Sequence, residues 1–415
     1  MPTDTTAERP AKFAELLRIG EYRAVYSSMV LSEVGDQLAR VALTLLVFER
    51  TRSASLAALT YALTLLPDLV SGPLLSGLGD RYPRRAVMIV TDLVRAGLVA
   101  LMVVPGMPLW FLCLLVVLVQ MLQAPFMGAR VGVIARVLTK EQYVAASAVG
   151  NMTIQLSFVA GYALGGPLVL WLGTNVALLL DAATFLLSAL VLRTALQVQP
   201  ATKYEHKRSN VTALWTSMTG CLRLIWRSGR LRTLWLLAVL PGFLIVPEGL
   251  IAPYAAELGG GVRDAAILFP LVPAGTVIGM WLFVRLVPPE RRLRWMGPLA
   301  VASCAALTLC LFSPPFPIVV VAYLLSGVAA CYDLPAGATF VMEVPDSARG
   351  QAFGLRMTML NLFQGGGVLL GGLFAGHFAV SAVIGWAGLI GVLIALALTF
   401  SWYSQAKSAA VVERH

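Results

Sequence analysis

Acidic side chains interrupt several apolar stretches of the chain. They are Glu33, Asp36, Asp68, Glu248 and Asp333. A charged group at the centre of a membrane helix costs about 2.5–3.5 kcal/mol, so such residues generally serve a function. A carboxyl group without a basic partner in a low dielectric holds its proton more readily, and it can bind and release that proton near neutral pH. The chemistry that these residues predict is proton exchange around a central cavity.

The first of these stretches places Glu33, Asp36 and Arg40 at positions i, i+3 and i+7, on one face of a helix. Asp36 lies about 21 Å along that helix from Tyr22, close to the middle of a bilayer. A role for Asp36 in transport competes with a simpler one, in which Asp36 and Arg40 form an ion pair that only holds the helix.

Prolines precede two of the other acids, Pro67 before Asp68 and Pro247 before Glu248. Because proline has no N–H group, it loosens the helix at these points. No basic residue is close in sequence to Asp68, Glu248 or Asp333. We expect each of these acids to line a water-filled cavity rather than to form a buried ion pair.

A dense charge cluster occupies the segment SGLGDRYPRR at 76–85, with Asp80, Arg81, Arg84 and Arg85. Arginines alone would fix the orientation of the flanking helices, but an acid among them adds nothing to that orientation. We expect Asp80 to act as a latch at the start of another helix, where the helix dipole favours a carboxylate. The arginines would then pair with acids or with lipid phosphates. The alternative is that the cluster only sets the topology.

Three further arginines lie within or next to apolar stretches. Arg95 follows Asp92 by three residues, which predicts a local ion pair or a partner for the charge cluster. Arg130 and Arg356 are expected at a gate or at the lipid interface.

The elements that must position these side chains are membrane helices. Of the 415 residues, 58% are hydrophobic and only 13% are charged, whereas a soluble domain carries about 25% charged residues. Apolar stretches of about 18 residues or more recur along the chain, and each can cross the bilayer as a helix. The predicted fold class is therefore an all-α polytopic membrane protein with about 12 transmembrane helices. The expected spans are 22–48, 55–79, 86–104, 108–135, 147–172, 174–197, 230–256, 263–285, 294–312, 316–342, 352–375 and 379–403.

The net charge of +10 follows the pattern of a membrane topology. If both termini are cytoplasmic, most Lys and Arg residues outside the spans fall on the cytoplasmic side, and only Arg50, Arg52 and Arg263 fall on the other. Basic residues on the cytoplasmic side meet anionic lipid headgroups. The sequence predicts a multi-pass protein of the plasma (inner) membrane that contacts membrane lipids and binds no nucleic acid.

Nothing in the sequence predicts a metal site, a cofactor or an enzyme. The five cysteines are scattered without a C-x-x-C pair, and the three histidines lie far apart. Motifs such as G-x-S-x-G and H-E-x-x-H are missing from the sequence. The first apolar stretch is too long for a signal peptide and has no cleavage site, so we expect it to remain as a helix.

A long polar stretch divides the chain into two predicted six-helix bundles, 1–197 and 230–415. Residues 198–229 form the linker between them. Apolar residues recur at helical spacing in its second part, with arginines at other positions. They are Leu214, Met218, Cys221, Leu222 and Ile225. This pattern predicts an amphipathic helix on the inner membrane surface.

The two halves repeat a common pattern. GYALGG at 161–166 matches GVLLGG at 367–372, a shift of 206 residues, and Pro67 matches Pro273 at the same shift. Pro125 matches Pro335 at a shift of 210. Matches at nearly one shift indicate an internal repeat. Two repeats in the same orientation are typical of transporters whose binding site lies between the halves.

Four segments are similar to those of a known family. GLGDRYPRR resembles a helix 2–3 loop motif, G-x-L-x-D-R-x-G-R-R, with Ser76 and Pro83 in place of its two glycines. Three other segments of this chain resemble those of one branch of the same family. They are SEVGDQLARVAL in the first apolar stretch, residues 129–149, and VPDSARGQAFGL at 344–355. The family is the major facilitator superfamily, and the branch contains the enterobactin exporter and related multidrug efflux proteins. The resemblance implies two six-helix bundles, export and proton antiport.

Two motifs depart from the family pattern. The helix 4 motif, R-x-x-Q-G, has Gln120 in place of its arginine. The helix 5 antiporter motif, G-P-x-x-G-G, keeps Gly161, Gly165 and Gly166 but has Tyr162 in place of its proline. We expect these glycines to let neighbouring helices approach closely and move past one another.

The predicted function is that of a secondary active transporter. It would be an alternating-access exporter of lipophilic or amphiphilic small molecules, such as drugs or siderophore-like compounds, by proton antiport. Its partners would be its substrate, protons and membrane lipids. It would need no cofactor and would take its energy from the proton-motive force. We expect it to work as a monomer. Sodium coupling and facilitated diffusion stay open. The alternatives are a transporter of lipids or lysolipids between leaflets and a non-transporting membrane receptor.

Overall fold

The computed structural model describes residues 13–75, 82–197, 211–345 and 349–412, and these residues form helices without a strand. The N-terminal half contains α1 (Phe13–Leu16), α2 (Gly20–Thr51), α3 (Ala54–Ala62), α4 (Pro67–Leu75), α6 (Arg84–Met102), α7 (Leu109–Met121), α8 (Gln123–Val137), α9 (Lys140–Leu172) and α10 (Thr174–Ala195). The linker helix α11 (Val211–Arg227) follows. The C-terminal half contains α12 (Gly229–Val239), α13 (Pro241–Leu244), α14 (Val246–Gly249), α15 (Ile251–Glu257), α16 (Gly261–Leu268), α17 (Leu271–Leu286), α18 (Pro289–Thr308), η1 (Leu309–Phe312), α19 (Phe316–Ala329), η2 (Ala330–Tyr332), α20 (Asp333–Glu343), α21 (Arg349–Ala375) and α22 (Val380–Val412). The all-α fold class is confirmed.

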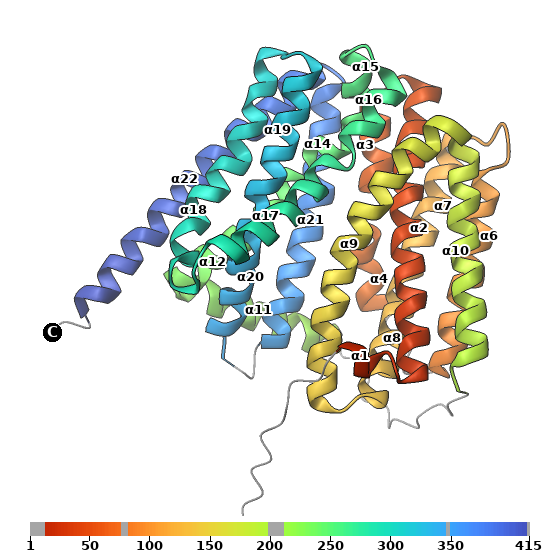
Figure 1. Cartoon of the computed structure of the whole chain (residues 1–415), viewed down its shortest axis with the longest axis horizontal. Helices are drawn as coiled ribbons and strands as arrows, with labels where there is room; N and C mark the ends of the chain where they lie inside the picture. Colours follow the sequence, from red (N-terminus) through yellow and green to blue (C-terminus); the bar gives the residue numbers. More distant parts are fainter. Residues whose placement is uncertain (1–12, 76–81, 198–210, 346–348, 413–415) are drawn as a thin grey trace, which may run out of the picture.

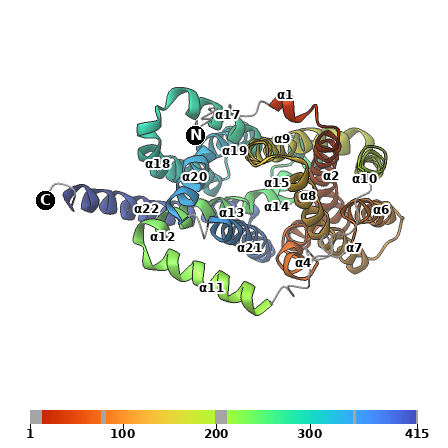
Figure 2. The same ribbon diagram turned by 90° about the horizontal axis from the view of Figure 1, so that it is seen from below.

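The helices form two bundles that lie side by side (Figure 1). In the N-terminal half α2 packs against α9 and α10, and α6 packs against α10. In the C-terminal half α18 packs against α22, and α17 packs against α19. Helices α1 and α11 and the end of α22 lie at one end of the molecule, which we call the terminal side (Figures 1 and 2). Helices α15 and α16 lie at the other end, the far side.

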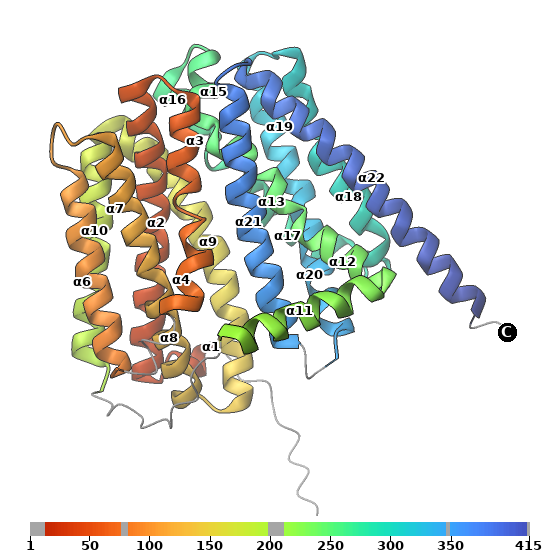
Figure 3. The same ribbon diagram turned by 180° about the vertical axis from the view of Figure 1, so that it is seen from behind.

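The halves pack most closely at the far side, where α3 meets α21 and α9 meets α16 (Figures 1 and 3). Gly372 of α21 faces Ala58 of α3 with no room for a side chain between them, and Gly166 of α9 faces Ala266 of α16 in the same way. Ser55 Oγ also donates to the carbonyl oxygen of Gly372 at 2.7 Å. Because Gly166 and Gly372 are equivalent in the predicted repeat, the two halves close the far side through equivalent glycine–alanine contacts.

The other two glycines of the predicted helix 5 motif pack within the N-terminal half. A Cβ atom at Gly161 would lie 3.0 Å from the carbonyl oxygen of Val34, and one at Gly165 would lie 3.3 Å from Val41 Cβ. Both contacts bring α9 against α2. The expectation of close helix packing is therefore met at all three glycines, but only Gly166 contacts the other half.

Prolines break some of the expected spans. The second expected span is split between α3 and α4, immediately before Pro67. The seventh is split into α12 to α15 at residues 240, 245 and 250, one to three residues before Pro241, Pro247 and Pro253. A proline inside a helix removes a hydrogen bond and clashes with the preceding turn. Helix α2, the counterpart of α12 to α15 in the first half, runs unbroken for 32 residues.

Several of the described helices are long and apolar enough to cross a membrane. These seven are Leu109–Val137, Thr174–Ala195, Gly261–Leu286, Arg291–Phe312, Phe316–Glu343, Ala352–Ala375 and Val380–Gln405. The chain is a polytopic membrane protein. The total of about 12 spans stays a prediction, because the other expected spans carry charges, as α2 does, or are interrupted, as at Pro67.

The predicted amphipathic helix of the linker is α11. Cys221 and Ile225 are buried, whereas Arg223 and Arg227 are exposed. Seen from the terminal side, α11 lies along one edge of the molecule (Figure 2). The earlier part of the linker lies outside the described residues, and the boundaries at 197 and 230 stay predictions.

Candidate functional site

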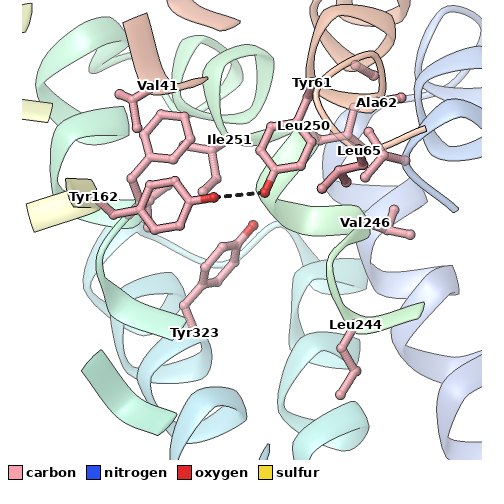
Figure 4. Close-up of a cluster of buried hydrophobic side chains, with 14 of the residues drawn as sticks. Val41, Tyr61, Ala62, Leu65, Tyr162, Leu244, Val246, Leu250, Ile251 and Tyr323 are labelled. Atoms are coloured by element: carbon pink, nitrogen blue, oxygen red, sulfur yellow. Dashed lines mark hydrogen bonds between the residues drawn. The ribbon is translucent and has the colours of Figure 1, made fainter. Parts of the chain in front are cut away.

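A carboxyl group between two tyrosines joins the halves. Glu248 of α14 accepts a hydrogen bond from Tyr61 Oη at 2.7 Å and a longer one from Tyr162 Oη at 3.4 Å. The two hydroxyl groups are 2.9 Å apart and point toward each other, and the hydroxyl group of Tyr323 points toward the same place (Figure 4). Tyr61 belongs to α3 and Tyr162 to α9, so these bonds cross from one half to the other.

Arg40 of α2 lies beside this bridge. Its guanidinium group lies 5.5 Å from the ring centre of Tyr61 and 5.9 Å from that of Phe158, and its Nη1 donates to Gln37 at 3.0 Å. Arg40 and Glu248 are 208 residues apart, within the shift of the repeat. A cation and an anion therefore occupy equivalent positions of the two halves and lie on either side of Tyr61.

A cavity of about 180 Å³ lies between the halves next to Glu248. Its lining comes from both halves and combines two acids with aromatic and apolar groups. The residues include Phe158, Tyr162, Glu248, Val272, Met280 and Asp333. Glu248 and Asp333 thus both line this cavity.

Asp333 nevertheless has a basic partner, which corrects the expectation that it has none. Arg356 of α21 donates from Nη2 to Asp333 Oδ1 at 2.6 Å and from Nε to the carbonyl oxygen of Ala238 at 3.3 Å. The predicted placement of Arg356 at the lipid interface is wrong, because only 8% of its side chain is exposed. The two residues stand 23 positions apart, too far for sequence spacing to pair them.

A second ion pair lies inside the N-terminal half. Arg95 of α6 donates to both oxygens of Asp36 at 2.9 and 3.0 Å, and its guanidinium group lies 4.1 Å from the ring centre of Phe185. The side chain of Arg95 is fully buried and that of Asp36 is 10% exposed. The alternative in which Asp36 forms an ion pair with Arg40 is wrong, since Asp36 pairs with Arg95.

Asp92 and Asp181 complete this charged group. The local pair expected between Asp92 and Arg95 is wrong, because Asp92 accepts a hydrogen bond from Ser188 at 2.5 Å, and Ser188 is 2.6 Å from Ser28. Asp181 of α10 is 1% exposed. Sequence reasoning missed Asp181, although a single acid in the apolar stretch 174–195 is the same signal that identified Asp68.

Glu33 and Arg130 form a further buried pair of charges in the N-terminal half. Each residue is 9% exposed, and their charges lie close enough to act on each other. Arg130 is thus placed inside the bundle rather than at the lipid interface, and Glu33 does not line the cavity between the halves.

The sequence identifies the family. A model of the Major Facilitator Superfamily matches residues 25–313. The chain belongs to the major facilitator superfamily. It is a membrane transporter of small-molecule substrates and not an enzyme. Within the described residues, no group of His, Cys, Asp and Glu side chains could hold a metal ion.

A curated relative of the transporter is the multidrug efflux pump Tap of Mycobacterium tuberculosis. The two sequences are 26% identical over 308 residues, which cover 70% of this chain and 72% of Tap. Among solved structures, the nucleoside transporter NupG matches 92% of this chain and 99% of its own with a TM-score of 0.66 at 16% identity. A second solved structure is that of a bacterial homologue of the human lysosomal transporter Spinster, in an inward-facing and occupied conformation. It matches 95% of this chain and 97% of its own, with a TM-score of 0.65 at 15% identity. These structures share the fold.

The helix 2–3 motif of the transporter is described in part. Asp80 and Arg81 lie outside the described residues, as does the side chain of Asp68. Arg84 Nη1 donates to the carbonyl oxygen of Gly132 at 2.6 Å, and Arg85 donates to that of Arg193. Acids and lipid phosphates stay predicted partners for the other N–H groups of these two arginines. Arg84 and Arg85 bind carbonyl groups near the C-terminal ends of α8 and α10, where the helix dipole favours a positive charge.

Proposed function

We propose that the protein exports lipophilic or amphiphilic small molecules in exchange for protons. The observation that carries this proposal is the position of Glu248, which borders the central cavity and at the same time accepts hydrogen bonds from Tyr61 and Tyr162 of the other half. A single carboxyl group can therefore interact with a substrate, with a proton or with the opposite half. The efflux activity named for the relative Tap supports the direction.

The proposed orientation places the terminal side in the cytoplasm and the protein in the plasma membrane. The positive-inside distribution supports it. In this orientation the glycine–alanine contacts would close the outer side, as in an inward-facing state. The relative motion of the halves would then open the contacts at Gly166 and Gly372.

In the proposed cycle, an ionised Glu248 holds the tyrosines and keeps the outer side closed. A substrate in the cavity, or a proton on Glu248, weakens these bonds and permits the halves to move. When Glu248 is ionised and the cavity holds no substrate, the outer side stays closed. The halves therefore move only with a proton or a substrate bound, and the protein exchanges the two. One proton that enters down a potential of 100 mV supplies about 2.3 kcal/mol. No cofactor is required, and we expect a monomer to suffice.

The test uses purified protein in liposomes that contain a pH-sensitive dye, with tetraphenylphosphonium as the probe substrate. We expect probe-dependent proton flux in the wild type. Glu248→Gln should lose the proton flux and keep exchange of labelled for unlabelled probe, whereas Glu49→Gln, at an exposed acid, should behave as the wild type. Probe movement without proton flux in the wild type would refute antiport.

Lipid transport is a second candidate, favoured by one observation. A cavity of about 400 Å³ between α21 and α22 is lined by apolar residues. Among them, Leu370, Phe374 and Trp386 are more than half exposed, on helices that can span the membrane. This is the apolar lateral opening that a lipid or lysolipid would require. Movement of a fluorescent lysolipid between leaflets, in liposomes where tetraphenylphosphonium stays untransported, would favour it.

A further inference from the structure

The charged group inside the N-terminal half is not electrically balanced. Asp36 and Asp92 both lie beside Arg95, and Asp36 and Arg95 are the charged groups that act on Asp181. Even with Arg40, which lies near Asp36, three carboxyl groups thus face two guanidinium groups. Asp92, Asp181 and Arg95 are at most 1% exposed. Unbalanced buried charge is expensive, so carboxyl groups in such sites carry protons.

Polar atoms in this group also lack partners. One oxygen of Asp92 and two nitrogens of Arg95 are buried without a hydrogen bond among the described residues. A buried polar atom without a partner is rare in folded proteins. The group therefore has capacity for a proton or for water beyond the hydrogen bonds that it makes.

Asp181 sits in a space that the sequence of α2 creates. A Cβ atom at Gly35 would overlap Asp181 Oδ1 and Thr184 Oγ1. Thr184 Oγ1 lies 3.5 Å from Asp181 Oδ1 and donates to the carbonyl oxygen of Asp181 at 2.7 Å. The glycine beside Asp36 is thus what admits the Asp181 carboxyl group to the interface between α2 and α10.

A small cavity lies beside this group and Arg40. Its volume is about 20 Å³, and Asp36, Asp181 and Arg40 contribute to its lining, together with Thr64 and Gln120. A polar cavity of more than about 10–15 Å³ can hold a water molecule. Arg40 therefore borders the same cavity as Asp36 and Asp181, and its guanidinium group also lies 5.5 Å from the ring centre of Tyr61, which binds Glu248.

We propose that Asp181, with Asp36, forms a proton-binding site in the N-terminal half that is separate from the central cavity, and that Arg40 couples its charge to Glu248. The step is the loss or gain of one proton by the Asp181 carboxyl group, without any other reactant. When Asp181 is ionised, it attracts Arg40 away from Tyr61 and weakens the bridge to Glu248. The coupling part of this inference rests on the proposed function, but proton binding at Asp181 does not.

The test of proton binding is infrared difference spectroscopy of the full-length protein in liposomes as the pH is raised. The wild type should lose a carboxylic-acid band. Asp181→Asn should remove that band, and Asp181→Glu should move it to another wavenumber. Asp92→Asn and the exposed-acid control Glu49→Gln should retain it. A band that survives unchanged in both Asp181 variants, or that only Asp92→Asn removes, would overturn the proposal.

Gly35→Ala gives a second test that does not alter a charged group. The added methyl group displaces the Asp181 carboxyl group, so the carboxylic-acid band should shift. An unshifted band in a folded Gly35→Ala protein would count against the site, even if Asp181→Asn does not fold.

The coupling is tested by proton-driven uptake of tetraphenylphosphonium. Arg40→Gln should abolish proton-driven uptake while the carboxylic-acid band at Asp181 persists with a changed pH midpoint. If Arg40→Gln abolishes uptake but leaves the pH midpoint of the band unchanged, Arg40 has only a structural role and does not couple Asp181 to Glu248. If the wild type shows no proton-driven uptake, the proposed antiport fails, and the infrared measurement still decides whether Asp181 binds a proton.

Discussion

The first helices of the two halves are equivalent in the repeat, but they are built differently. In the N-terminal half α2 is unbroken, and its acid Asp36 binds Arg95 of α6 within the same bundle. In the C-terminal half the corresponding stretch is broken into α12 to α15, and its acid, Glu248, binds the other half. The N-terminal helix thus pairs its acid inside its own bundle, whereas the C-terminal helix turns its acid toward the cavity and the other half.

The largest expected effect separates the two buried ion pairs. Arg95→Met leaves Asp36 without its partner at a site where only 10% of the Asp36 side chain is exposed, and it should lower the free energy of unfolding by about 3–5 kcal/mol. Arg356→Met should cost less, since 30% of the Asp333 side chain is exposed and can be hydrated. Thermal unfolding in detergent measures both, with the double variant Asp36→Asn/Arg95→Met as a control that regains part of the loss. Equal losses for Arg95→Met and Arg356→Met would contradict the comparison.

The glycine–alanine contacts should respond alike in both halves. Gly166→Val and Gly372→Val each overfill a packed contact, at a cost of about 1–3 kcal/mol, and should shift the protein away from the state that is closed at the far side. Distances between spin labels at Glu49 and Arg263 should then increase. Gly161→Val, whose contact lies within one half, should lower stability without this shift. A response to only one of the first two variants would break the equivalence of the contacts.

The broken helix should matter more for turnover than a proline in an unbroken one. Pro247→Ala should slow transport about tenfold, equivalent to about 1.4 kcal/mol in the barrier, because a continuous helix resists the bending that the cycle requires. Pro167 lies inside the continuous helix α9, and Pro167→Ala should change the rate little. Initial rates of tetraphenylphosphonium uptake compare the two, and an equal slowing in both would remove the distinction between the halves.

The smallest effect is expected at the terminal side. Arg230 binds Glu343 at 2.7 Å, but 46% of the Arg230 side chain is exposed. Arg230→Gln should therefore change the free energy of unfolding by about 0–1 kcal/mol, as measured by thermal unfolding. A loss as large as that of Arg95→Met would mean that burial does not set the strength of these pairs.

The sequence was enough to predict the fold class from apolar length, and the cost of buried charge drew attention to Glu248 and Asp333, which line the cavity. It was not enough to pair the charges. Asp36 and Arg95 are 59 positions apart, and Tyr61 and Glu248 are 187 apart. Helical spacing gives the face on which a side chain lies, and it therefore favoured local partners such as Arg40 for Asp36. Tyr61 carried no signal at all, since a tyrosine in an apolar helix is ordinary.

The account depends most on the bridge between Glu248 and the two tyrosines. Its direct test is a pair of spin-label distances in liposomes, one across the far side (Glu49 to Arg263) and one across the terminal side (Arg136 to Arg223), in the wild type and in Glu248→Gln. Because an uncharged amide holds the tyrosine hydroxyl groups less strongly, the variant should lengthen the first distance and shorten the second without added substrate. Two unchanged distances in a folded Glu248→Gln protein would contradict the claim that this carboxyl group keeps the far side closed.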